Sequence, residues 1–275
     1  MKKVFVINAK GEKEPFSFKK VYFSARRAGA SDEIAFRIAK KIEVEVFDGI
    51  STKEIFKKVK RELRKISPRV ALSFNLKEGI RRLGPSGYPF EKFVAGIFRA
   101  QGYKVRVNVH LKGKCCVYEI DFVAKNEKVI YIGECKYHHV AGEKVDLKVA
   151  LSNYARFLDL KDSILEKESH QIRPILVTNT KFTKDAISYS ECVGTELLGW
   201  RYPKDKGLEK LIEERKLYPI TILPSLKSSL AKYLIGWGVA LIEDLKKLDI
   251  KEFSKKTGFS KRELEYLLKE AQLLF

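Results

Sequence analysis

Two acidic residues interrupt a pair of apolar, strand-like segments in the middle of the chain. Asp121 lies in the segment 119–124 and Glu134 lies in the segment 129–136, and the polar run Lys125-Asn126-Glu127-Lys128 separates the two segments. β-Branched and aromatic residues on both sides of a short polar connection predict an antiparallel hairpin. The fold must therefore accommodate a hairpin that carries two carboxylates among apolar side chains.

The expected register of this hairpin brings the charged residues together. The pairing places Asp121 opposite Ile132. Because side chains along a strand alternate with a period of two, Asp121, Glu134 and Lys136 would project from one face. Glu119 would share that face, either as a third acid of a site or as a solvated hairpin residue. We therefore expect at least two acids and one amine to lie close together.

Two acids and a lysine on neighbouring strands are the groups that metal-assisted phosphodiester hydrolysis needs. Carboxylate oxygens hold Mg²⁺ through few protein contacts and leave room for water and phosphate. The metal generates the nucleophile, and a lysine can orient the water or pair with the charged phosphate. In a lysine-rich chain the same residues could instead form ordinary ion pairs, and a single match to such a short pattern is weak.

The runs Ile120-Asp121 and Glu134-Cys135-Lys136 resemble the motif of the PD-(D/E)xK nuclease superfamily. Members of that superfamily often carry another acid on the helix that precedes these strands. The resemblance implies the following roles: Asp121, Glu134 and the main-chain carbonyl of Cys135 bind Mg²⁺ or Mn²⁺, Lys136 is the catalytic lysine, and Glu91 is an auxiliary acid.

The order of the flanking elements agrees with that resemblance. An acid-bearing helix at 89–101, a stop at Gly102 and an alternating strand at 105–111 precede the hairpin, which gives the α-β-β-β order of the nuclease core. A helix at 146–158 and a buried strand at 172–178 would extend a mixed α/β sheet.

A wider part of the chain resembles restriction-endonuclease-like domains of the Mrr type. The residues that carry this resemblance also include the run 177–183 and Leu198-Gly199-Trp200. The commonest Mrr pattern has Gln where this chain has Glu134, and the acid favours a conventional metal site. His138 and His139 follow the motif directly, and adjacent histidines in such a place are more often a loop feature than metal ligands.

Residues 1–85 form a second recognisable pattern. A strand at 4–7 and a turn at Gly11 precede expected helices at 19–29, 32–46, 53–66 and 70–83, and Ser51 with Glu54 forms a capping-box signature. With the run Asp48-Gly49-Ile50-Ser51-Thr52, this segment resembles an ATP-cone, a nucleotide-sensing module of ribonucleotide reductases and some repressors.

The ATP-cone resemblance implies that Lys10, Lys20 and Thr52 bind ATP or dATP. The family usually places Lys-Arg before an Asp-Gly turn to hold the phosphates, whereas this chain has Asn8-Ala9-Lys10-Gly11. The alternative is a cone retained as a helical docking or DNA-binding surface without a nucleotide.

The C-terminal segment contains two short glycine-containing turns between apolar helical stretches, at 235–238 and 256–262. Such turns resemble helix-hairpin-helix motifs, in which free main-chain N–H groups at the next helix start bind a phosphate. Gly258, Ser260 and Lys261 are the residues expected to contact DNA, and Trp237 is expected in the core. An ordinary helical cap is the alternative.

Turn clusters at 84–89 and 219–224 divide the chain into three expected domains at 1–85, 86–222 and 223–275. The net charge of +20 makes a polyanion the favoured partner. The first domain carries most of this charge, with 22 Lys and Arg against 10 Asp and Glu. Lysine-rich surfaces also occur as ion-pair networks in thermophile proteins.

Four cysteines without CxxC spacing, and a Met1-Lys2-Lys3 start without an apolar segment, favour reduced thiols in the cytoplasm. No stretch approaches the roughly 20 apolar residues that span a bilayer.

The combined pattern predicts an α/β multidomain protein: a mostly helical ATP-cone, a restriction-endonuclease-like mixed sheet and a small all-helical C-terminal domain. The expected function is a metal-dependent endodeoxyribonuclease acting on duplex or branched DNA, with a nucleotide effector at the first domain. The alternatives are a catalytically idle nucleic-acid-binding regulator and an RNA-processing nuclease, since no residue is seen to read a 2′-hydroxyl. Resemblance to nucleases that cut both strands implies a homodimer.

Overall fold

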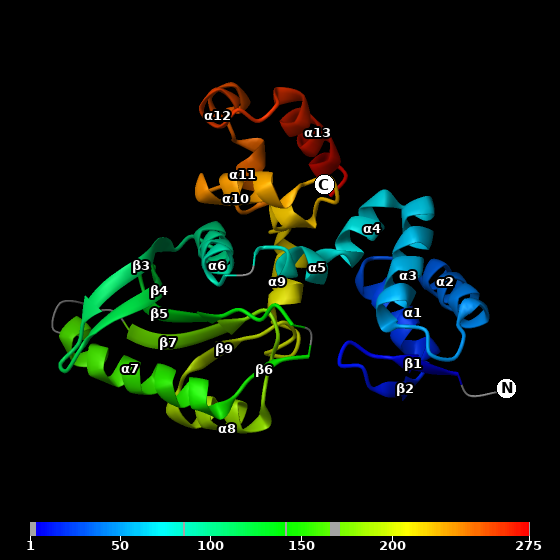
Figure 1. Ribbon diagram of the computed structural model, residues 1–275. Coiled ribbons are helices and arrows are strands. Elements are labelled where there is room, and N and C mark those ends of the chain that lie inside the picture. The colour runs from blue at the N-terminus through cyan, green and yellow to red at the C-terminus, as the bar shows by residue number, and fades with distance from the viewer. Residues whose placement is uncertain (1–3, 85, 141, 166–170, 275) are drawn as a thin grey trace.

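The computed structural model describes residues 4–84, 86–140, 142–165 and 171–274. The charged start at Met1-Lys2-Lys3, and Pro85 of the expected turn cluster at 84–89, lie outside the described residues. The chain is a mixed α/β protein (Figure 1). The strands of the described residues are β1 (Phe5–Ile7), β2 (Lys13–Pro15), β3 (Lys104–Lys112), β4 (Val117–Lys125), β5 (Val129–Lys136), β6 (Lys144–Val145), β7 (Gln171–Thr178), β8 (Lys181–Phe182) and β9 (Glu196–Leu198). Their helices are α1 (Phe18–Arg27), α2 (Asp32–Glu45), α3 (Thr52–Ile66), α4 (Pro68–Phe74), α5 (Leu76–Arg81), α6 (Tyr88–Ala100), α7 (Leu147–Leu165), α8 (Lys184–Val193), α9 (Leu208–Arg215), α10 (Ser228–Gly236), α11 (Ile242–Lys246), α12 (Ile250–Thr257) and α13 (Lys261–Gln272), with a 3-10 turn η1 at Ile220–Ile222.

The N-terminal segment packs three helices against the β1–β2 hairpin. The expected strand near 4–7 and the first three expected helices are confirmed, and the predicted capping box of Ser51 and Glu54 starts α3. This segment has its own apolar cluster, which runs from Val6 to Ala71 and includes Ile38, Ile42 and Leu63. Burial of these side chains from water holds the helices together.

The fourth expected helix, at 70–83, is wrong because the chain breaks at Asn75 into α4 and α5. Asn75 is buried, its Nδ2 donates to the carbonyl of Ile222 at 3.2 Å, and its Oδ1 accepts from Nζ of Lys60 at 3.0 Å. After the break, α5 runs close to η1: a Cβ on Gly79 would lie 2.9 Å from Cα of Ile222. Long-range contacts that local periodicity does not report therefore set this break.

A five-stranded sheet of order β3-β4-β5-β7-β9 forms the centre of the molecule. The strands β3, β4 and β5 are antiparallel, whereas β7 is parallel to β5 and β9 is parallel to β7. The parallel pair β5–β7 needs a long crossover, which α7 supplies. In Figure 1, α6 covers one face of the sheet, and α7 and α8 cover the other. The strands and helices expected here from the sequence are confirmed.

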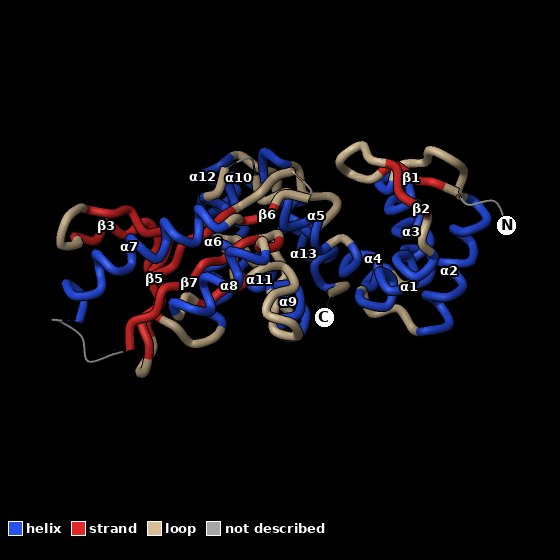
Figure 2. Tube along the Cα trace, turned by 90° about the horizontal axis from the view of Figure 1, so that it is seen from below, coloured by secondary structure: helices blue, strands red, loops and turns tan. Residues whose placement is uncertain are grey.

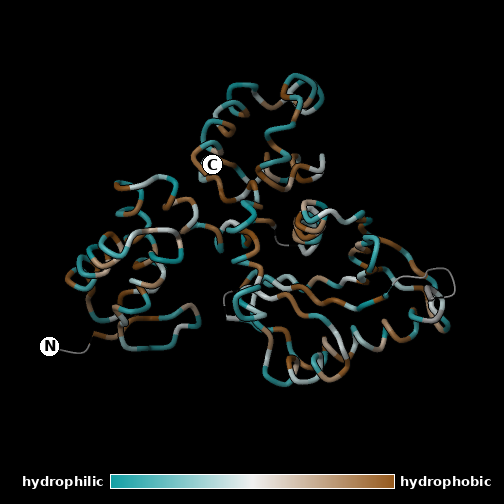
Figure 3. The backbone as a smooth tube through the Cα atoms, turned by 180° about the vertical axis from the view of Figure 1, so that it is seen from behind, coloured by the Kyte–Doolittle hydropathy of each residue, from teal (hydrophilic) through white to brown (hydrophobic). Residues whose placement is uncertain are grey.

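The apolar core around α6 joins the sheet to the C-terminal helices. Phe90, Phe93 and Ile97 of α6 are fully buried, and α6 appears as a largely apolar helix in Figure 3. On the side away from the sheet, α6 meets the C-terminal segment: a Cβ on Gly96 would lie 3.1 Å from the side chain of Leu241. This core extends through α5 as well, and Figure 2 shows α4 and α5 linking the N-terminal helices to the rest of the molecule.

The C-terminal segment consists of two helical hairpins, α10–α11 and α12–α13. Each turn has a glycine with positive φ, Gly238 at +90° and Gly258 at +77°, a conformation that glycine adopts without a Cβ clash. The expectation that Trp237 belongs to the core is wrong: 43% of this residue is exposed, and the ammonium of Lys256 lies 5.3 Å from its ring centroid. Among the described helices, none is long and apolar enough to cross a membrane.

Candidate active site

The β4–β5 hairpin has a register that differs by two residues from the expected one. Phe122 pairs with Gly133, so Asp121 stands beside Glu134, and the expected pairing of Asp121 with Ile132 is wrong. A shift by an even number of residues preserves which side chains share a face. The correction therefore brings the two acids closer together than the expected register did.

A three-residue connection, Asn126 to Lys128, and a glycine explain this register. Oδ1 of Asn126 accepts the N–H groups of Lys128 and Val129, both at 2.9 Å, which closes the turn. In the strands, the ring of Phe122 covers Gly133, where any Cβ would lie 2.2 Å from the ring carbons. Only glycine fits beneath this ring, so the pair of Phe122 and Gly133 fixes the alignment.

Strict alternation of side chains fails at Asp121. Tyr118 and Ile120 of β4 pack with the α7 side of the sheet, whereas Phe122, two residues after Ile120, packs with the α6 side. Asn108 of β3 lies across from Asp121, between two regular pairs, and has a φ of +51°. Asn is among the few residues that tolerate this left-handed conformation. Asp121 thus sits where the sheet is locally twisted, and the prediction that period-two alternation alone places it is wrong.

The side chain of Asp121 is tied to the neighbouring strand. Its Oδ2 accepts the main-chain N–H of Cys135 at 2.6 Å. The N–H and C=O of one strand residue point to the same side, so the carbonyl of Cys135 is directed toward Asp121 as well. The thiol of Cys135 is buried in the α6 core, and this burial raises its pKa well above the usual value. Only the main-chain carbonyl of Cys135 therefore fits the predicted ligand role.

Glu134 is an almost fully buried acid held by two cations. It is 6% exposed, its Oε1 lies 2.7 Å from Nζ of Lys136, and its Oε2 lies 2.5 Å from Nη1 of Arg156. A buried carboxylate is stable only when it is paired in this way. Arg156 comes from α7 and was not predicted as a site residue. Its available signal was the i, i+3, i+7 spacing of Asn153, Arg156 and Leu160, which places an arginine on a buried helix face.

Glu91 joins the same charge cluster from the first turn of α6. Burial, followed by the negative charges of Asp121, Glu134 and Glu119, raises the pKa of Glu91 to about 7, while Lys136 opposes the shift. Burial and the charge of Glu134 likewise raise the pKa of Asp121 to about 6. Glu119 is exposed and acts only as a neighbouring charge. The structure therefore places Glu134 in contact with Lys136, with Asp121 and Glu91 near enough for their charges to interact with this pair.

A divalent cation fits the chemistry of this cluster. Carboxylates that are close together repel one another, and a bound cation reverses that repulsion. Across the part of the chain that the structure describes, no three His, Cys, Asp or Glu side chains are gathered to hold a metal ion. The predicted set of Asp121, Glu134 and one carbonyl would leave several positions for water and phosphate, as Mg²⁺ prefers.

The loop after Lys136 is held by β7 and the residue that follows it. Oγ1 of Thr178 donates to the carbonyl of Lys136 at 2.6 Å, and Asn179 exchanges two hydrogen bonds of 2.8 Å with the main chain of His138. Nδ1 of His138 lies 2.8 Å from Oε2 of Glu143. The run 177–180 thus fixes the path of the chain directly after the catalytic lysine candidate.

Two of the three residues expected to bind a nucleotide lie together. Lys20 and Thr52 line a pocket of about 220 Å³ between β1–β2, α1 and α3, and Nζ of Lys20 pairs with Oε1 of Glu14 at 3.0 Å. Lys10 does not line this pocket; its side chain lies against Gly142, where a Cβ would be 2.9 Å from Cε of Lys10. The pocket is smaller than typical ligand sites of about 300–1,000 Å³, so nucleotide phosphates would extend outside it.

The Asp48–Thr52 run has a local structural role. Oδ1 of Asp48 accepts the N–H of Phe5 at 2.9 Å, and the carbonyl of Ile50 accepts the N–H of Ile7 at 3.0 Å. This run therefore pairs with β1 and starts α3. Asn8, one of the departures from the ATP-cone pattern, closes the β1–β2 turn, because its Oδ1 accepts the N–H of Lys10 at 2.8 Å.

The residues expected to bind DNA lie in the α12–α13 turn. Gly258 ends α12 and Ser260 is the N-cap of α13, but its side chain makes no capping hydrogen bond. Lys261 is the first residue of α13 and is exposed. This arrangement leaves N–H groups of the first turn of α13 free to bind an anion.

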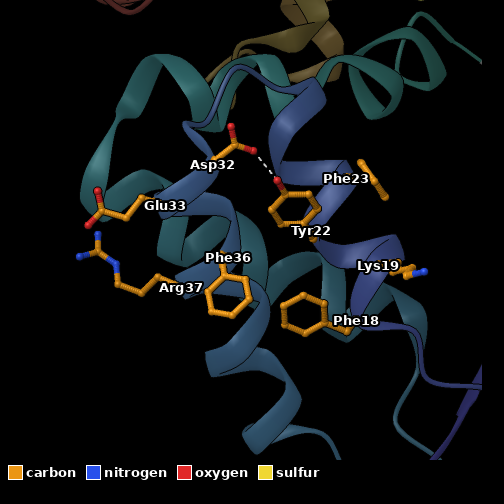
Figure 4. Close-up of a pocket in the computed structure, with 8 residues that line it drawn as sticks. All are labelled: Phe18, Lys19, Tyr22, Phe23, Asp32, Glu33, Phe36 and Arg37. Carbon is orange, nitrogen blue, oxygen red and sulfur yellow. Dashed lines mark hydrogen bonds between the residues drawn. The ribbon is translucent and has the colours of Figure 1, made fainter.

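An aromatic groove lies on the N-terminal helices, away from the acid cluster. Phe18, Tyr22 and Phe36 lie between α1 and α2, Phe23 points outward from α1, and the hydroxyl of Tyr22 donates to Asp32 (Figure 4). Phe23 and Phe36 are 50% and 57% exposed, which is unusual for large apolar side chains in a cluster.

The fold is that of a mixed α/β protein with a helix-flanked five-stranded sheet, and it carries Asp121, Glu134 and Lys136 on β4 and β5. Comparison with known proteins then places it. The family model "AF1548-like, C-terminal" matches residues 218–275. An Archaeoglobus fulgidus protein described as uncharacterized is 36% identical over 180 residues, which is 65% of this chain and 98% of that protein. A crystal structure of AF1548, described as a protein of unknown function, is 33% identical with a TM-score of 0.59 and covers 68% of this chain and 97% of that one. The chain belongs to the AF1548-like family.

Proposed function

We propose that this protein is a metal-dependent endodeoxyribonuclease. The observation that carries the proposal is the convergence of Asp121, Glu134 and Lys136 at neighbouring strands, with Glu91 of α6 near enough for its charge to interact with theirs. The sheet order and the flanking helices support a restriction-endonuclease-like core of the PD-(D/E)xK type. A buried acid, Glu134, and a half-buried acid, Asp121, beside a lysine have a high electrostatic cost, and such perturbed groups cluster at functional sites.

The roles of the residues follow from their positions. Asp121, Glu134 and the carbonyl of Cys135 would hold Mg²⁺ or Mn²⁺, which supplies an activated water and neutralises phosphate charge. The ammonium of Lys136, 2.7 Å from Glu134, would orient the attacking water or pair with the phosphate. Glu91, with its pKa near 7, suits proton transfer near neutral pH. Arg156 holds Glu134 in place.

A substrate panel tests this proposal. Duplex, single-stranded and branched DNA, together with RNA, would be incubated with the full chain in Mg²⁺, in Mn²⁺ and in EDTA. We expect cleavage of DNA in either metal and none in EDTA. Binding without cleavage in every metal would favour the idle nucleic-acid-binding regulator, and preferential cleavage of RNA would favour the RNA-processing nuclease.

We also propose that the N-terminal segment is an ATP-cone that senses ATP or dATP. The shared pocket of Lys20 and Thr52 supports this role. Calorimetric titration with ATP and dATP tests it: Lys20→Ala should weaken binding at least about tenfold, because a charge-assisted phosphate contact is lost. The neighbouring Lys19 lies outside this pocket, so Lys19→Ala should bind as the parent does. Absence of binding in the parent would leave the cone as a docking surface.

We further propose that the chain divides into three domains at 1–85, 86–222 and 223–275, and that the C-terminal domain is helix-hairpin-helix-like and contacts DNA. We also propose that the protein forms a homodimer and is located in the cytoplasm. The two helical hairpins support the C-terminal assignment. Light scattering of the purified chain, alone and with DNA, tests the homodimer.

A further inference from the structure

A cleft of about 900 Å³ lies between the central core and the C-terminal helices. Its walls are α5, the segment leading into α6, the first turn of α6, His139 after β5, and α10. In Figure 1 these helices meet above the sheet, on the side that α6 covers. None of the roles described so far uses this cleft.

The charge of the cleft suits a polyanion. Three cationic side chains line it, Arg81, Arg82 and Lys232, against the single acid Glu78, which is already paired with Arg81. The guanidinium of Arg82 is fixed by donation to the carbonyls of Thr221 at 2.9 Å and Leu223 at 3.1 Å. Lys232 is exposed and forms no ion pair with any described residue. Phosphate oxygens complement such a wall.

Two helices begin at this cleft. The first turns of α6 and α10 both line it, and neither helix has a side-chain hydrogen bond at its N-cap, Gly87 and Lys227 respectively. At the start of α10 the main-chain N–H groups of Ser228 and Ser229 can bind an anion and add to the positive wall. At the start of α6 Pro89 has no N–H and the N–H of Phe90 donates to the carbonyl of Gly87, so the N–H of Tyr88 is the one that α6 offers there.

Tyr88 supplies a stacking surface in the same cleft. It is 42% exposed, and Nζ of Lys92 lies 4.6 Å from its ring centroid. Nζ of Lys92 also donates to the carbonyl of Ile235 at 3.4 Å, so Lys92 links the ring of Tyr88 to α10. Exposed aromatic rings in basic grooves stack on unpaired bases.

The cleft begins next to the acid cluster. Tyr88 and Glu91 are three residues apart on α6, so their side chains are neighbours on one helix face. On the other wall, His139 follows Lys136 by three residues. A volume of about 900 Å³ has room for a few unpaired nucleotides.

We propose that this cleft binds an unpaired DNA strand beside the cleavage site. The placement beside a cleavage site rests on the proposed nuclease function, whereas binding of the strand does not. A positive wall, the uncapped start of α10 and an exposed tyrosine recognise the phosphates and one base of a single strand.

Fluorescence anisotropy with a labelled oligothymidylate in EDTA tests strand binding without any cleavage. Tyr88→Ala and Lys232→Glu should each weaken binding at least about fivefold, because a stacked base or a phosphate contact is lost. Tyr88→Phe keeps the ring and should bind as the parent does. The matched controls Tyr266→Ala and Lys184→Glu change an exposed tyrosine on α13 and an exposed lysine on α8, and should have little effect.

Unchanged oligothymidylate affinity of the folded variants Tyr88→Ala and Lys232→Glu would overturn the proposal. It would also be overturned if these variants lost as much affinity for duplex DNA as for the single strand. Tighter binding of an RNA oligonucleotide than of DNA would overturn the choice of DNA. If Tyr88→Ala does not fold, parent-like binding by Lys232→Glu overturns the proposal by itself. A parent that binds the strand in this way but cuts no DNA in Mg²⁺ or Mn²⁺ would remove the nuclease function and keep the cleft.

Discussion

Oδ2 of Asp121 accepts a hydrogen bond from the main-chain N–H of Cys135 at 2.6 Å. Asp121 lies directly next to the last regular pair of β4 and β5, Phe122 with Gly133, and this hydrogen bond holds its carboxylate beside Glu134. Because it uses one oxygen of Asp121, the other oxygen and the remaining lone pairs stay available for a cation or water. The same contact explains how an acid is held in a twisted part of the sheet.

The twist at Asp121 depends on the left-handed conformation of Asn108. Asn108→Val should lower the free energy of unfolding by about 1–3 kcal/mol, because β-branched residues are strained at positive φ. Asn108→Gly adopts this conformation freely and should stay within about 1 kcal/mol of the parent. Chemical denaturation measures both. Equal stability of the two variants would show that the twist does not depend on this φ angle.

Arg156 is expected to stabilise Glu134 most when no metal is present. Arg156→Ala should lower the free energy of unfolding by about 2 kcal/mol in EDTA, since it leaves a buried carboxylate with only Lys136. In Mg²⁺ the loss should be smaller because the cation replaces the guanidinium. The matched control is Arg173→Ala, which removes a more exposed pair with Glu196. It should cost at most about 1 kcal/mol and show no dependence on Mg²⁺. Losses that do not respond to metal would count against Glu134 as a ligand.

Most of the central fold could be predicted from local patterns. The alternation of Val105 to Leu111 and the apolar runs around Asp121 and Glu134 report strands directly, and helical spacing reports α6 and α7. The site could be predicted only in part. Arg156 reaches Glu134 across 22 positions of sequence, and no local pattern encodes that contact.

The errors have the same cause. The hairpin register depends on Asn126 in the turn and on the fit of Phe122 over Gly133. The break at Asn75 depends on a hydrogen bond to Ile222, and both are contacts that exist only in the folded chain. Period-two alternation also assumes a regular strand, whereas the left-handed Asn108 lets neighbouring residues of β4 change faces.

Glu213 should make stability depend on pH at the contact between α1 and α9. Burial and then the charge of Glu209 raise the pKa of Glu213 to about 7, while Arg201 and Arg27 oppose the shift and Glu214 adds to it. Because the pKa of Glu213 is higher in the folded than in the unfolded chain, ionisation of Glu213 lowers the free energy of unfolding. The folded protein loses none of this stability below pH 4.5 and loses it progressively as the pH rises from about 4.5 through 7.

Glu213→Gln should therefore be more stable than the parent at pH 8.5 and nearly equal to it at pH 4.5. The gain should be on the order of 1 kcal/mol, because solvent screens this partly exposed carboxylate. Urea denaturation across this range measures the difference. A difference that stays constant with pH would contradict the assigned ionisation.

Lys261 should contact a DNA phosphate at the start of α13. Lys261→Ala should weaken duplex binding and reduce the slope of log affinity against log salt by about 1, as expected for the loss of one phosphate contact. Lys269→Ala changes an exposed lysine in the last turn of the same helix and should leave the slope unchanged. If both variants change the salt slope equally, Lys261 does not form a specific phosphate contact.

The most direct test of the nuclease account is the cleavage of DNA in Mg²⁺ by Asp121→Asn and Lys136→Met. Asn can still accept the N–H of Cys135, so the fold should persist while the charge is lost. Asp159→Asn and Lys112→Met are the controls: Asp159 accepts main-chain N–H groups of Cys115 and Cys116, and Lys112 is exposed on β3. Both site variants should lose at least about 100-fold in cleavage rate and keep DNA affinity within about twofold, and both controls should cut as the parent does. Parent-like cleavage by either site variant would contradict the assignment.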